Sequence, residues 1–244
     1  MREPGSAARA TLDRTEEHRF FTGLASAMLA VTVAGFARSY LLVPTLGRPE
    51  GTLPFTPLVH VHAAVAFGWC LLFVLQSWLV ITGRTTQHRR VGRIGVAWYV
   101  ALLGLGPFVA THAAARYGAP PDELAFLAVS VGNIVAYGLL FGAALHWRRR
   151  PAVHKRLMVL GMVAMLTAPF GRLLTLPYQL DHVLGPGLVV VALAWWDGRT
   201  MGRLHPVTAF GGVALLGWEL LPNAYMHSAW WTGTARWLLD TFAA

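Results

Sequence analysis

Charged side chains are scarce in this sequence of 244 residues. Asp, Glu, Lys and Arg make up 13% of it and hydrophobic residues 55%, whereas soluble globular domains carry about 25% charged residues. Cysteine is almost missing, because Cys70 stands alone inside an apolar run. This excludes a disulfide framework and a cysteine-based zinc or iron–sulfur site. Since Pro and Gly are spread through the apolar runs, the composition excludes a disordered chain as well as a soluble domain.

Apolar stretches dominate what is present, and most are long enough to cross a bilayer as helices of about 20 residues. Seven stretches qualify: 20–44, 59–81, 92–115, 123–146, 157–178, 183–196 and 206–221. The sixth is the weakest because it is short and starts near Gly185-Pro186-Gly187. The brief connections predict an all-α bundle of seven antiparallel transmembrane helices over residues 20–222. Residues 1–19 are expected to form a polar arm and do not resemble a cleaved signal peptide.

The net charge of +9 is explained by topology. If the N-terminus is cytoplasmic, 15 of the 20 basic residues fall on the inner side: Arg2, Arg9, Arg14, Arg19, Arg84, Arg89, Arg90, Arg93, Arg148, Arg149, Arg150, Lys155, Arg156, Arg199 and Arg203. This bias is the positive-inside rule. We therefore expect a multi-pass protein of a bacterial cytoplasmic membrane, with its N-terminus inside and its C-terminus outside. Membrane lipids are the expected partners, and nucleic acid is not one.

The C-terminal segment, residues 223–244, combines polar residues with Trp230, Trp231 and Trp237. Tryptophans favour the membrane–water interface. The pattern predicts an interfacial helix on the outer face, and a cap over the bundle is the alternative.

A short pattern occurs twice. His88-Arg-Arg-Val-Gly-Arg-Ile-Gly95 and His154-Lys-Arg-Leu-Met-Val-Leu-Gly161 share H-[RK]-R-x-x-x-x-G, and each opens a predicted span. One interpretation is a repeat of two helical hairpins, 59–115 and 123–178, with the functional centre between them. The other is the ordinary enrichment of basic residues at cytoplasmic helix starts.

Ten histidines divide into two sets by predicted depth. His18, His88, His146, His154 and His205 fall at the inner surface, where we interpret them as interfacial side chains. The others fall at or near the outer ends of spans: His60, His62, His112, His182 and His227. Arg172 lies roughly 10 Å below the outer boundary, and ionisable groups at such depth normally face the protein interior with a partner. Glu219 is the expected counter-charge.

These outer residues predict a cofactor site in the outer half of the bundle. His62 and His112 match in depth and are the expected axial ligands of a b-type haem, with Arg172 on a propionate. Alternatively, three of the five outer histidines and Glu219 hold a mononuclear iron, copper or zinc ion, and Arg172 binds an anionic substrate. His60 serves as a ligand or supports one, since residues two apart on a helix point about 200° apart. A metal-free polar pocket and scattered interfacial histidines stay open as alternatives.

Several of these motifs occur together in one family. The stretch Gly35-Phe-Ala-Arg-Ser-Tyr40, the His60-Val-His62 pair and the two H-[RK]-R patterns resemble those of small bacterial integral-membrane proteins with HxH, HRRxG and HKRLM patterns. More distantly, the chain is similar to membrane b-type cytochromes and ferric-reductase-like proteins. Those proteins stack two haems between helices, whereas no span here has histidines at both required depths. The resemblance therefore implies at most one haem, near the outer face.

The expected function is a membrane redox protein or oxidoreductase with a haem or a histidine-bound metal, and with a lipophilic or quinone-like small molecule as a further partner. Glu219 and Arg172 are the candidate catalytic residues. Two alternatives remain: a cofactor-free lipid-modifying or cyclising enzyme that uses Glu219, Asp181 and histidines as acids and bases, and a non-enzymatic transporter or accessory subunit.

Overall fold

The computed structural model describes residues 4–174, 176 and 180–243, and these residues contain helices and no strand. The all-α prediction is confirmed. The elements are α1 (Pro4–Phe36), the π-helical η1 (Ala37–Leu41), α2 (Val43–Leu46), α3 (Pro57–Ile81), α4 (Thr85–Arg116), α5 (Pro121–His146), α6 (Pro151–Leu174), α7 (Asp181–Met201), the π-helical η3 (Val207–Gly211), α8 (Gly212–Leu220), α9 (Pro222–Tyr225) and α10 (Ala229–Phe242).

Five helical stretches are long and apolar enough to cross a membrane: Arg14–Leu46, Pro57–Ile81, Thr85–Arg116, Pro121–His146 and Pro151–Leu174. They correspond to the first five predicted spans, which is consistent with a membrane protein. The predicted spans 183–196 and 206–221 are also helical, as α7 and as η3 with α8. These two helical segments are not among the five stretches that are long and apolar enough to cross a membrane. The predicted arm is helical from Pro4, as the beginning of α1.

Proline and glycine set several helix boundaries. Pro57, Pro121 and Pro151 are the first residues of α3, α5 and α6, where a missing N–H donor has no cost and the proline φ angle suits a helix. Gly83 and Gly202 follow α3 and α7 with φ angles of 72° and 66°, a conformation that other residues rarely adopt. These signals were visible in the sequence.

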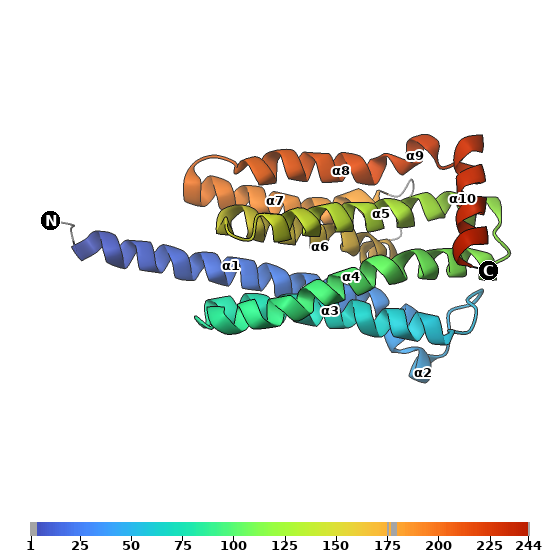
Figure 1. Ribbon diagram of the computed structural model, residues 1–244, viewed down its shortest axis with the longest axis horizontal. Helices are drawn as coiled ribbons and strands as arrows, with labels where there is room; N and C mark the ends of the chain where they lie inside the picture. The colour runs from blue at the N-terminus through green and yellow to red at the C-terminus, as the bar shows by residue number, and fades with distance from the viewer. Residues whose placement is uncertain (1–3, 175, 177–179, 244) are drawn as a thin grey trace.

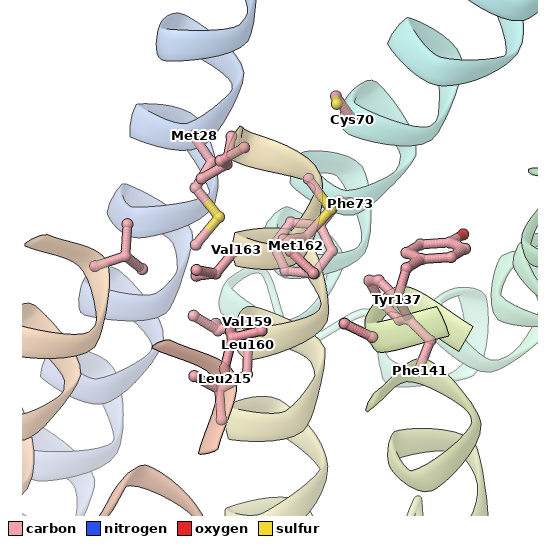
Figure 2. Close-up of a cluster of buried hydrophobic side chains, with 14 of the residues drawn as sticks. Met28, Cys70, Phe73, Tyr137, Phe141, Val159, Leu160, Met162, Val163 and Leu215 are labelled. Carbon is pink, nitrogen blue, oxygen red and sulfur yellow. The ribbon is translucent and has the colours of Figure 1, made fainter. Parts of the chain in front are cut away.

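Helix α6 is the centre of the bundle. It packs against α1, α5, α7 and α8, while α1 also packs against α3, and α3 against α4 (Figure 1). The main core lies around α6 and includes Met28 of α1, Phe73 of α3, Phe141 of α5, Met162 of α6 and Leu215 of α8 (Figure 2).

The bundle has two distinct ends. The one at the left of Figure 1, which we call the basic end, contains the start of α1 and the α3–α4, α5–α6 and α7–α8 turns. At the opposite end, α10 lies across the bundle against α4 and α5. Trp231 of α10 is buried there and donates from Nε1 to the Leu124 carbonyl (2.8 Å), whereas Trp230 and Trp237 are exposed. Helix α10 therefore covers that end, and its role as a membrane-interface anchor stays a prediction.

Candidate functional site

A cavity of about 260 Å³ lies at the basic end, between α1, α3, the start of α4 and the start of α6. Its wall is mainly apolar and includes Phe21 of α1, Phe73 of α3 and Met158 of α6. The polar side chains on its wall include His88 of α4 and His154 of α6. Small-molecule sites combine an apolar lining with placed polar groups, and this cavity has both.

Both imidazoles contact the preceding helix through Nδ1. Nδ1 of His154 donates to the main-chain carbonyl of Ala144 on α5, at 2.8 Å. Nδ1 of His88 lies 3.3 Å from the main-chain carbonyl of Gln76 on α3, and the Gln76 side-chain amide contacts the same nitrogen. Within the described residues, Nε2 of neither ring takes part in a hydrogen bond. Each ring is thus anchored to the preceding helix by one nitrogen, which leaves the other for a ligand.

Glu17 and Lys155 form an ion pair beside these histidines. Glu17 belongs to α1 and Lys155 to α6, both line the cavity, and both side chains are partly exposed. Arg148 of the α5–α6 turn and His18 of α1 also line it. The rim therefore has a basic excess, although its lysine is already paired.

A second ion pair lies beside the cavity and is buried. Arg156 follows Lys155 and binds Asp197 of α7, with Nε at 3.1 Å from Oδ1; both side chains are almost fully buried. Asp197 also accepts from the main-chain N–H of His205 (3.0 Å), which belongs to the α7–α8 turn. Burial lowers the pKa of His205, and the nearby Arg156 guanidinium lowers it further. This cluster ties α6, α7 and the turn together.

Three of the histidines predicted to bind a cofactor lie at the opposite end of the α3–α4 hairpin. Nδ1 of His60 is hydrogen-bonded to the Tyr40 hydroxyl (2.8 Å), and Nε2 of His112 to the Thr56 hydroxyl (3.1 Å). Nδ1 of His62 is buried without a hydrogen-bond partner among the described residues. Within the described residues, His60 and His112 each have one ring nitrogen in a hydrogen bond, whereas the buried Nδ1 of His62 has none.

The other predicted site residues belong to different parts of the bundle. His182 is buried at the start of α7, with its ring 6.2 Å from that of Phe126 on α5, and His227 is exposed between α9 and α10. Glu219 is buried on α8. The guanidinium of Arg172 lies 4.6 Å from the Phe36 ring centroid and donates to the Ala168 carbonyl (2.8 Å). The ion pairs of the described residues are those of Glu17 and Asp197, so the expected pairing of Arg172 with Glu219 is not observed there.

Among the described residues, no three side chains of His, Cys, Asp or Glu lie in an arrangement that could hold one metal ion. The side chain of Asp181, an acid–base candidate, and Tyr178, the end of the fifth predicted span, lie outside the described residues. A haem needs only two imidazoles, so a haem stays a prediction.

The position of the cavity histidines among arginines predicts interfacial side chains, and no sequence pattern singles out Asp197. The signal that could have identified His88 and His154 is the repeated H-[RK]-R-x-x-x-x-G pattern. A scan of the chain against protein-family models found no match, and searches of curated proteins and of solved structures found none either.

Proposed function

We propose that this chain is a multi-pass membrane redox protein that binds the head group of a lipophilic quinone or quinol in the cavity at the basic end. The observation that carries this proposal is the pair His88 and His154, which both contact the preceding helix through Nδ1 and line one mainly apolar cavity. The proposal keeps the redox class expected from the sequence. It moves the ligand site from the outer half of the bundle to the basic end.

The membrane arrangement that we propose has seven crossings, in which α7 and the η3–α8 segment join the five long apolar stretches. The concentration of Arg and Lys at the basic end supports a cytoplasmic location for that end. The N-terminus is then cytoplasmic and the C-terminus outside, in a bacterial cytoplasmic membrane. Such a cavity lies near the membrane surface, where the ring of a lipid-soluble quinone reaches polar groups while its tail stays in hydrocarbon.

Cavity size and lining support a ring-shaped head group. About 260 Å³ lies just below the range of 300–1,000 Å³ that is usual for small-molecule pockets, so one substituted ring suits it better than a larger ligand. Phe21, Phe73 and Met158 supply apolar surface for the ring faces. A phosphate head group is a weaker candidate, because the wall is mainly apolar, Lys155 is paired with Glu17, and Arg148 donates to the Leu145 carbonyl.

Histidine chemistry explains why two imidazoles suit a quinol. When His154 is neutral, its proton is on Nδ1, which donates to Ala144, so Nε2 keeps a lone pair. That lone pair can accept a hydrogen bond from a quinol hydroxyl, and a protonated ring can donate to a quinone carbonyl. Imidazole changes its protonation near neutral pH, and its two nitrogens can donate and accept. His88 and His154 therefore act as the proton-exchanging contacts of the head group.

Binding of short-chain ubiquinone and menaquinone analogues to the purified chain in lipid nanodiscs tests this proposal. We expect His88→Ala and His154→Ala each to weaken binding by roughly 5- to 150-fold, since a hydrogen bond in a desolvated site contributes about 1–3 kcal/mol. The matched control is His146→Ala, which changes a histidine at the same end that does not line the cavity. It should leave the affinity unchanged.

Two results would overturn the proposal. One is equal quinone affinity in the wild-type chain and in the His88→Ala/His154→Ala double variant when both are folded. The other is displacement of the bound quinone by phosphatidylglycerol at the concentrations at which phosphatidylglycerol itself binds to the chain. This result would assign the cavity to a phospholipid head group.

One observation favours a second candidate, a haem or metal ion at the opposite end. Nδ1 of His62 is buried without a hydrogen-bond partner among the described residues, and buried polar groups normally have a partner. A cofactor bound by His62 and His112 would supply one. A Soret band in the visible spectrum of the purified chain that is lost in both His62→Ala and His112→Ala would support a haem, and a colourless protein without stoichiometric metal would exclude this candidate.

A further inference from the structure

Glu219 is an acidic side chain deep inside the bundle. It lies on α8, 13 residues after Pro206, hence about 20 Å along this helical segment from the basic end. Its exposed fraction is 2%, and its Oε1 atom is buried with no hydrogen-bond partner among the described residues. Among the described residues, Glu219 makes no ion pair, and it does not line the cavity of the proposed quinone site.

The helix face that carries Glu219 lies toward α7. Gly212 is seven residues earlier, about two turns, so the two residues share a face. A Cβ atom on Gly212 would lie 2.6 Å from Cγ1 of Val190, which shows that this face contacts α7. The neighbouring Trp218 donates from Nε1 to the Gly132 carbonyl of α5 (2.9 Å). Glu219 is therefore enclosed by helix contacts on both sides.

No cation neutralises this carboxyl group within the described part of the chain. Away from the turns of the basic end, the helices packed against α8 carry few titratable groups. These are Asp122, Glu123 and Tyr137 on α5, Arg172 on α6, Asp181 and His182 on α7, and Tyr225 on α9. None that the structure describes is ion-paired with Glu219. Arg172 instead lies over Phe36 of α1.

An isolated carboxylate in an apolar interior is far less stable than the neutral acid, so such a group takes up a proton. We propose that Glu219 is a proton-binding site inside the bundle, neutral at physiological pH in the conformation described here. The ligand is a proton, which converts the carboxylate into a carboxylic acid. The site is independent of the quinone proposal, and membrane-embedded acids of this kind commonly belong to proton pathways.

Labelling with dicyclohexylcarbodiimide tests the proposal, because this hydrophobic reagent adds to protonated carboxyl groups in apolar surroundings. The full chain in lipid nanodiscs is treated at pH 7 and the modified peptide is identified by mass spectrometry. We expect the label on Glu219 and not on Glu16, an exposed acid on α1. Glu219→Gln should remove the label and, as a neutral isostere, leave the melting temperature unchanged.

Three results would contradict the proposal. Absence of label on Glu219 at pH 7 means that the carboxyl is ionised or paired. Protection of Glu219 by Na⁺ or K⁺ at constant pH and ionic strength assigns the site to a metal cation. A large change in melting temperature in Glu219→Gln means that the residue is charged in the folded state. If that variant does not fold, labelling of the wild-type chain still decides, because it needs no substitution.

Discussion

His154, Lys155 and Arg156 are consecutive residues that each bind a different helix. His154 binds the Ala144 carbonyl of α5, Lys155 binds Glu17 of α1, and Arg156 binds Asp197 of α7. Successive residues on an α-helix are 100° apart, so three of them reach neighbours on most sides of α6. This is why a tripeptide at the start of the central helix joins the bundle at its basic end.

The Arg156–Asp197 pair is the most buried of these contacts, with exposed fractions of 2% and 0%. Burial removes both charges from water, so the pair adds little stability in comparison with apolar residues of similar volume. Loss of one partner is different, because it leaves the other charge buried and alone.

We therefore expect Arg156→Met and Asp197→Leu each to lower the free energy of unfolding by about 3–5 kcal/mol. The Arg156→Met/Asp197→Leu double variant should recover most of this loss. Thermal or denaturant unfolding of the purified variants in detergent measures both effects. Single variants as stable as the wild type would show that the pair is hydrated, and a double variant no better than the singles would show that other contacts of Asp197, such as the one to His205, dominate.

Two helical hairpins, α3–α4 and α5–α6, are closed by the same pattern. In each, the histidine that opens the second helix binds a main-chain carbonyl of the first, at Gln76 or Ala144. The glycine seven residues later faces the first helix too. A Cβ atom on Gly95 would lie 3.5 Å from Leu72, and one on Gly161 would lie 2.7 Å from Phe141. The repeated sequence pattern is thus a repeated hairpin contact, and a duplication of the two hairpins stays a prediction.

Helix α1 approaches α6 closely at another glycine. A Cβ atom on Gly35 would lie 2.5 Å from the main-chain oxygen and 2.6 Å from Cα of Pro169. These are backbone atoms, so no side-chain rotation can relieve the overlap. Small residues at helix contacts let membrane helices pack at such distances.

Gly35→Ala should therefore separate α1 from α6 and destabilise the fold by about 1–3 kcal/mol. The matched control is Gly23→Ala in the same helix, where a Cβ atom meets nothing within 4 Å. There, alanine should be neutral or stabilising by up to about 1 kcal/mol, because it favours helix more than glycine does. The melting temperatures of the two variants in detergent give the comparison. Equal effects would mean that the α1–α6 contact adjusts freely.

At the scale of the whole molecule, the turns alternate between two ends, and most basic residues lie at one of them. The bundle is asymmetric along this axis. The basic end holds the cavity and the ion pairs, and the opposite end carries α10 with its exposed tryptophans. This asymmetry is what a membrane orientation requires.

Cysteine labelling can establish the orientation and the number of crossings. In a Cys70→Ala background we expect a membrane-impermeant maleimide to label Thr52→Cys in intact spheroplasts. Thr86→Cys and Thr200→Cys should react only after permeabilisation, since both lie at the basic end. Labelling of Thr200→Cys from outside, with Thr86→Cys protected, would reduce the crossings to five. Labelling of Thr86→Cys from outside would reverse the orientation.

Much of the fold was predictable from local signals. The apolar stretches located the helices, and Pro57, Pro121 and Pro151 marked three of their starts. The glycines within the helices differ: a Cβ atom on Gly35 or Gly106 would meet a neighbouring helix closely, whereas one on Gly104 would meet nothing within 4 Å. The hydrophobic periodicity and the composition of the sequence indicate that a glycine lies in a helix. They do not indicate which face of that helix is turned toward a neighbouring helix.

The sequence by itself determined that this protein is an apolar helical bundle whose basic residues gather at one end, because these properties depend on local composition and spacing. Only the tertiary structure decided which polar groups share a site. His88 and His154 are 66 residues apart and line one cavity, while Arg172 and Glu219 do not pair in the described part of the chain. Such convergence depends on the rotation of each helix about its axis, which is set by side-chain packing around α6.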